Sequence, residues 1–160
     1  MNRKLSALSL SYHPLTSTPF LKNNDYCELP PSDALRPYIR CFWGNEHPQI
    51  RSKTSRRLVI PDTCMDIIIK VNHSNHTIDA SFCTMDEHTY QSHEATDAAA
   101  SSSIFGIRFF FWTAMLFSPE SFRHTKNQAY HPDGFFQGIT AELTEIALRF
   151  NTLTERARTA

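Results

Sequence analysis

Two short runs of β-branched residues form the centre of the hydrophobic pattern. The runs 59–60 and 67–69 consist of valine and isoleucine, and a polar turn that begins with Pro61 and Asp62 separates them. Such runs favour strands, and a run without polar alternation is typical of a strand covered on both faces. Proline cannot donate a ladder hydrogen bond, and aspartate bonds readily to its own backbone. We therefore expect a central hairpin in which 59–60 pairs with 67–69.

The remaining pattern predicts further strands first and helices later. Strands are expected at 38–43, 77–78, 81–84, 89–90 and 104–109. The low-complexity residues 97–103 predict a loop. A dense apolar patch at 110–117 predicts one or two helical turns. Ser118 followed by Pro119 is a good helix start and predicts a short helix to about Arg123.

The clearest helical periodicity lies near the carboxyl-terminal end. Apolar residues recur on one face of a helix at Ile139, Leu143, Ile146, Ala147 and Phe150. Thr152 and Glu155 have the spacing of a capping box and predict the start of another helix. Strands followed by helices predict an α+β fold that is mainly β, a small barrel or sheet with helices on one side. The 160 residues are enough for one domain.

Composition removes several classes of function. Sixteen Lys and Arg balance sixteen Asp and Glu, so no overall cationic field draws the chain to nucleic acid or anionic lipid. The four cysteines show no CxxC spacing, which favours a reduced, intracellular chain. No run approaches the roughly 20 apolar residues of a membrane helix. We expect a cytoplasmic protein that does not bind membranes.

Candidate catalytic and metal-binding chemistry is sparse. The chain has eight histidines, but the close groupings at 73–76 and 88–93 lie in predicted turns and contain no His-x-His. There is no Gly-x-Ser-x-Gly, and four glycines are too few for a phosphate loop. We therefore expect no metal, no cofactor and no catalytic residues, that is, a protein that is not an enzyme.

Two isolated charges point to binding instead. Asp66 and Arg108 each interrupt an apolar strand, so we expect them close in space, either as a structural salt bridge or as polar groups that hold a ligand. Aromatic and sulfur side chains near them either fill the core or line a small-molecule pocket. The candidate ligand-binding residues are Tyr38, Trp43, Met65, Asp66, Arg108 and Phe109.

Three segments, residues 35–43, 57–69 and 105–109, form a combined pattern. Together they resemble the amino-terminal domain that precedes the DNA-binding half of many AraC-type bacterial transcription regulators, and the resemblance covers roughly residues 26–150. The family's characteristic positions are occupied by Trp43, Pro61, Asp62, Asp66, Gly106, Arg108 and Phe109. The resemblance implies a cupin-like small β-barrel followed by carboxyl-terminal helices. Such a domain senses a small-molecule effector in the barrel or dimerises, and it controls an attached helix-turn-helix domain.

The resemblance also divides the chain. Residues 1–25 are expected to form a flexible arm or edge strand, 26–150 the sensor and dimerisation domain, and 151–160 the start of a linker to a DNA-binding domain not present in this chain. A homodimer is expected, with DNA contacted only through that further domain. The candidate dimerisation residues are Ile139, Leu143, Ile146 and Phe150. The alternatives are a cupin-fold enzyme with a non-standard metal site and a pure oligomerisation module without ligand.

Two departures from the family pattern affect local structure. Thr63 stands where a glycine often follows Pro-Asp, so a turn with positive φ at this residue would be strained. Residues 110–112 are bulky aromatics where Pro-Gly is usual, which makes the turn after the 104–109 strand bulkier.

Overall fold

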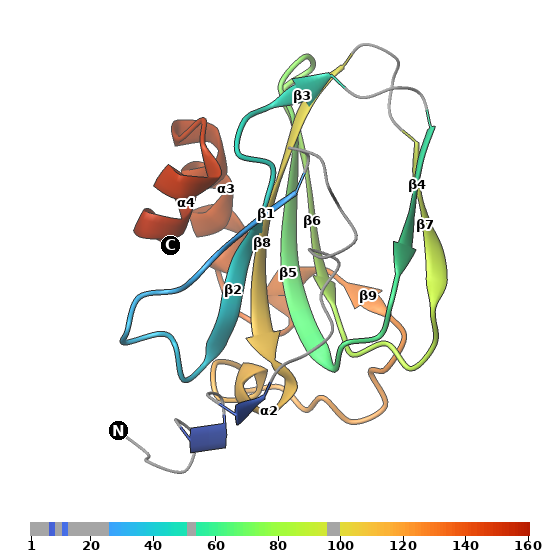
Figure 1. The fold of residues 1–160 in the computed structure, drawn as a ribbon, viewed down its shortest axis with the longest axis vertical. Coiled ribbons are helices and arrows are strands. Elements are labelled where there is room, and N and C mark those ends of the chain that lie inside the picture. The colour runs from blue at the N-terminus through green and yellow to red at the C-terminus, as the bar shows by residue number, and fades with distance from the viewer. Residues whose placement is uncertain (1–6, 9–10, 13–25, 51–53, 96–99) are drawn as a thin grey trace.

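A computed structural model describes residues 7–8, 11–12, 26–50, 54–95 and 100–160. It consists mostly of antiparallel strands with a few helices towards the carboxyl terminus (Figure 1), which confirms the expected α+β class. The expected arm at 1–25 lies almost wholly outside the described residues. None of the helices in the described part is long and apolar enough to cross a membrane.

The strands form two sheets. The main sheet has the order β1 (Cys27–Leu29), β2 (Ile39–Gly44), β8 (Ser101–Phe110), β5 (Cys64–Asn72), β6 (Thr77–Cys83) and β9 (Ala129–Tyr130), with β3 (Gln49–Ile50) pairing with the start of β8. The second sheet contains β4 (Thr54–Val59) and β7 (Tyr90–Ala95). Across the described residues, these pairings do not close into a barrel, because β1 and β9 remain the two ends of the main sheet.

The expected hairpin of 59–60 with 67–69 is wrong. Residues 54–59 pair with β7, whereas β5 pairs with β6 and β8, so the two runs lie in different sheets. The connection itself is as expected: Asp62 Oδ1 accepts a hydrogen bond from the Cys64 N–H at 3.0 Å, and Thr63 has a φ of 57°. Strand propensity marks a segment as extended but does not select its partner, and this turn carries the chain from one sheet to the other.

Two other local predictions need correction. Residues 101–103 begin β8 instead of belonging to a loop, and 97–99 lie outside the described residues. The apolar patch does form a short helix, α2 (Phe111–Ala114). The expected helix after Ser118 is wrong, because the Ser118 hydroxyl oxygen accepts the Glu120 N–H at 3.1 Å in a turn. This local bond competes with helix formation.

The carboxyl-terminal helices follow the predicted pattern. After a 3-10 turn, η1 (Pro132–Gly134), come α3 (Ile139–Arg149) and α4 (Leu153–Thr159). The capping box of Thr152 and Glu155 at the start of α4 is confirmed. The segment expected to begin a linker therefore contains a helix, and the Leu153 side chain of this helix is fully buried in the core.

The two faces of the main sheet differ in chemistry. Helices α3 and α4 cover one face, against β5 and against β1 and β2, and the β4–β7 sheet lies on the other side (Figure 1). The apolar core lies under the helices; its members on the two central strands are Met65, Ile67, Ile69, Val71, Phe105, Ile107 and Phe109. Because side chains alternate along a strand, their neighbours point away from the helices. We call this opposite face, which carries Trp43, Asp66, Ile68, Gly106 and Arg108, the polar face.

Candidate functional site

The centre of the polar face is the expected pair of Asp66 and Arg108. The two residues lie directly opposite each other in β5 and β8. Arg108 Nε donates to Asp66 Oδ1 at 3.0 Å and Nη2 donates to Oδ2 at 3.2 Å, so the contact is bidentate. The predicted proximity is confirmed. Each member of the pair also has a neighbour on the next strand: Cys41 of β2 lies beside Arg108, and Cys83 of β6 lies beside Asp66.

Two further carboxylates approach the same guanidinium. Asp62 Oδ2 lies 3.3 Å from Arg108 Nη1, and Glu28 Oε1 lies 4.0 Å from it. We call Glu28, Asp62, Asp66 and Arg108 the charged cluster. Their side chains are only 12 to 15 % exposed. With all groups ionised, the cluster holds three negative charges and one positive charge in a largely desolvated place.

Trp43 is fixed in this cluster by a glycine on the neighbouring strand. A Cβ atom on Gly106 would lie 2.2 Å from Cε2 of Trp43, so the indole occupies the space that a side chain would take. In this position Trp43 Nε1 donates to Asp66 Oδ1 at 2.8 Å. The guanidinium carbon of Arg108 lies 5.6 Å from the ring centroid, a distance at which cation–π attraction contributes.

The sequence reasoning missed Glu28 of the charged cluster and Tyr26, which lies beside it. The Tyr26 hydroxyl donates to Glu28 Oε1 at 2.7 Å, and its ring centroid lies 5.7 Å from that of Trp43. Glu28 pairs with Trp43 across β1 and β2. A signal was present, because Glu28 stands between Cys27 and Leu29, both of which pack against the core. In a strand that arrangement turns the carboxylate to the opposite face.

Burial and mutual attraction set the protonation of the cluster. Burial alone would lower the pKa of Arg108, but Asp66 and Asp62 outweigh it and raise this pKa well above its ordinary value. Burial raises the pKa of Asp62, against the attraction of Arg108. Burial also raises the pKa of Cys41 to about 12 and that of Cys83 to about 11. These two thiols stay protonated at neutral pH and are poor nucleophiles.

The other candidate ligand-binding residues lie elsewhere. Met65 and Phe109 face each other in the β5–β8 register and belong to the core under the helices. Tyr38 is half-buried against that core, and its ring centroid lies 5.5 Å from that of Phe117. The structure therefore brings Trp43 together with Asp66 and Arg108, and it places the remaining three candidates on the other side of the sheet.

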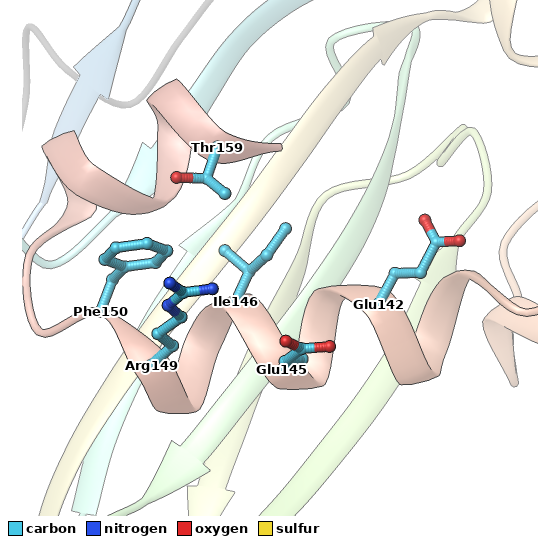
Figure 2. A pocket seen from close by; sticks show the side chains of 6 residues that line it. All are labelled: Glu142, Glu145, Ile146, Arg149, Phe150 and Thr159. Carbon is cyan, nitrogen blue, oxygen red and sulfur yellow. The ribbon is translucent and has the colours of Figure 1, made fainter.

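Some of the candidate dimerisation residues lie in or against the core, and some line a pocket at the surface of α3. Leu143 is 3 % exposed in the core, and Ile139 and Ile146 are packed against it. Ile146 and Phe150 line a shallow pocket of about 240 Å³ between α3 and α4, together with charged residues (Figure 2). The full lining is Glu142, Glu145, Ile146, Arg149, Phe150 and Thr159. The apolar stripe of α3 thus closes the domain, while its edge remains accessible.

Metal binding has no evident site in the described part of the chain. Within these residues, no group of three or more His, Cys, Asp and Glu side chains is arranged to hold a metal ion. His73 and His76 lie in the turn between β5 and β6, as their sequence context predicted.

The fold and the charged cluster together define the class of this protein. It is a mainly β α+β domain with helices on one face of an antiparallel sheet and a charged cluster on the other. The chain belongs to the family described as Domain of unknown function (DUF6597), whose model matches residues 27–131. The match includes the whole charged cluster and ends before α3. No curated protein and no solved structure matches the chain.

Proposed function

We propose that this domain is the effector-sensing and dimerisation part of an AraC-like transcription regulator. In this proposal the main sheet and the β4–β7 sheet form a cupin-like arrangement that holds a small molecule over the polar face. Occupancy of the site then controls an attached helix-turn-helix domain through the carboxyl-terminal helices. The charged cluster is the observation that carries the proposal.

The cluster is poorly explained by stability alone. Buried ion pairs are often replaceable by apolar residues at no loss of stability, because desolvation offsets their attraction. The immediate neighbours of Asp66 and Arg108 along their strands are apolar, so apolar side chains would suit these two positions as well. A few convergent polar groups beside aromatic surface are what orients a small ligand. Trp43 supplies that surface, and Arg108 supplies the donors.

Arg108 is the best placed group to contact a ligand. Two of its nitrogens, Nε and Nη2, are bound to Asp66, whereas Nη1 has only the longer contacts to Asp62 and Glu28. A ligand acceptor could therefore engage Nη1 without breaking the bidentate pair. β8 then continues from Arg108 back to Ser103, which contacts α4, so the same strand reaches both the site and the terminal helix.

The binding half of the proposal is tested by a thermal-shift screen of the purified protein against a library of small organic molecules. A compound that raises the melting temperature is then measured by calorimetry on Arg108→Lys and Trp43→Phe. Both substitutions are expected to weaken binding at least tenfold, because lysine lacks the planar fork and phenylalanine lacks the indole N–H. Glu87→Gln, in an exposed pair with Lys126, is the control. Equal affinity in all variants, or no binder in the screen, contradicts the proposal.

The dimerisation half is tested by sedimentation equilibrium. Phe150→Asp adds a charge at the accessible edge of α3 and is expected to produce monomers with unchanged far-UV circular dichroism. Leu58→Asp, at an exposed leucine of β4, is the matched control and is expected to remain dimeric. A wild-type protein that is monomeric at micromolar concentration contradicts this half, as does a Phe150→Asp protein that remains dimeric.

A further inference from the structure

Arg156 of α4 is a buried cation with neutral partners. Its side chain is fully buried. Nε donates to the Phe150 carbonyl at 2.9 Å, Nη2 to the Ala147 carbonyl at 2.9 Å, and Nη1 to Ser103 Oγ at 3.0 Å. The two carbonyls lie at the carboxyl-terminal end of α3, the negative end of its dipole, and would otherwise lack helical partners. Arg156 therefore joins three elements: α4, the end of α3, and β8.

One assignment of donors and acceptors satisfies every polar group in this network. A guanidinium can only donate, so Ser103 Oγ is the acceptor for Arg156. Ser103 Oγ also lies 2.9 Å from His73 Nε2. Ser103 is 1 % exposed, and among the described contacts no other acceptor receives its hydroxyl hydrogen. We assign the Ser103 hydroxyl as the donor to His73 Nε2, because this order gives its hydrogen an acceptor; Nε2 is then the unprotonated nitrogen of a neutral imidazole.

Protonation of His73 is incompatible with this order. An imidazolium Nε2–H can only donate, so Ser103 would face two donors and its own buried hydrogen would lose its acceptor. A second positive charge would also come close to Arg156. The titratable groups that face His73 are Arg156 from α4 and His76 from its own turn, whereas β8 presents the uncharged Ser101 and Ser103. Glu155, beside Arg156 on α4, attracts the guanidinium, but its carboxylate is bound by Thr152 and is hydrogen-bonded to neither Arg156 nor His73.

We propose that the docking of α4 on the sheet is an acid-sensitive switch: α4 is held while His73 is neutral and is released when His73 is protonated. This switch goes beyond the proposed sensing of a small molecule and does not depend on it. Burial lowers the pKa of His73 below 6.5 when α4 is docked, and Arg156 and His76 lower it further. The undocked state binds the proton more readily, so docking is at full strength above about pH 6.5 and weakens as the pH falls through the lowered pKa.

The switch is tested by nuclear magnetic resonance on the whole chain. The imidazole signals of His73 and the backbone amides of Leu153 and Arg156 are followed between about pH 7.5 and pH 5, the range in which histidine titrates. The amides are expected to shift with the same midpoint as His73, below 6.5, and to lose protection from hydrogen exchange on the acid side. Amides that stay unchanged and protected while His73 titrates overturn the proposal without any variant.

Two substitutions then separate His73 from its neighbour. His73→Gln offers a carbonyl oxygen to the Ser103 hydroxyl and cannot titrate, so α4 is expected to stay docked throughout. His76→Gln, in the same turn and without a contact to Ser103, is expected to keep the acid transition of the wild type. The same transition in His73→Gln as in the wild type overturns the proposal, and so does its loss in His76→Gln.

Discussion

Replacing Arg108 with methionine is expected to destabilise the domain more than neutralising any single partner of Arg108. The substitution leaves Glu28, Asp62 and Asp66 without their shared cation. Removing one member of a buried ion pair costs about 3–5 kcal/mol. The side chains are 12 to 15 % exposed, which places the loss at the lower end, about 3 kcal/mol. For a chain of this length that corresponds to a fall in melting temperature of about 6–12 °C.

Asp66→Asn is expected to cost less. Arg108 then keeps Asp62 and Glu28, and the amide oxygen can still accept the Trp43 Nε1–H. What is lost is the charge of one strong bidentate contact; hydrogen bonds to charged groups are worth about 1.5–3 kcal/mol. The order of the two losses follows from the number of carboxylates around one guanidinium.

The loss in Arg108→Met is also expected to depend on pH. Burial already raises the pKa of Asp62, and Arg108 opposes that rise, so the loss of the guanidinium raises this folded-state pKa further. The folded variant then favours the protonated carboxyl. The loss of unfolding free energy relative to wild type is therefore small at about pH 4 and grows as the pH rises through the raised pKa. The difference in unfolding free energy between wild type and variant is therefore largest at neutral pH.

Urea denaturation followed by circular dichroism at about pH 7 and pH 5 measures these free energies. Arg36→Met is the control, because Arg36 and Asp33 form an exposed pair at 2.9 Å, for which losses of at most about 1 kcal/mol are typical. Our reasoning about the charged cluster is refuted if Arg108→Met loses no more than Arg36→Met. It is also refuted if the loss is the same at both pH values.

Three further substitutions test other parts of the fold. Gly106→Ala is expected to displace the indole of Trp43 and cost about 1–3 kcal/mol through overpacking, which a shifted tryptophan emission spectrum and a denaturation curve would reveal. Thr152→Ala removes the capping box with Glu155, and a loss of about 1 kcal/mol, or about 2–4 °C in melting temperature, is expected by calorimetry. Leu143→Asp buries a charge in the core and is expected to unfold the domain, as circular dichroism would show; a folded but monomeric product would place Leu143 in an interface instead.

Local signals in the sequence were sufficient for most of the elements. The isoleucine-rich run of β5, the helical periodicity of α3 and the capping box of α4 each depend on neighbouring residues, and each is found in the structure. The pairing of Asp66 with Arg108 was also predictable, because a charge in an apolar strand needs a partner. The strand that pairs with β4 was not predictable, because strand propensity carries no information about which strand lies beside it.

Strand alternation alone could have excluded Met65 and Phe109 from the candidate site. They were included because aromatic and sulfur side chains are common in ligand pockets. Met65 precedes Asp66, and Phe109 follows Arg108, so the alternation of a strand turns each pair to opposite faces. By contrast, nothing local marks Arg156 as buried. It stands in a polar segment, and its burial comes from contacts with the end of α3 and with β8.

The central position of β8 has a consequence for the order in which the chain can fold. β8 separates β2 from β5, yet it is synthesised after both, and its register with β2 joins residues far apart in sequence, such as Trp43 and Gly106. Until residue 110 has left the ribosome, β2 and β5 have no partner between them and expose unpaired strand edges. Such edges template association with other chains, and pairing between distant segments is slow. A nascent chain stopped near residue 100 is therefore the aggregation-prone form of this protein.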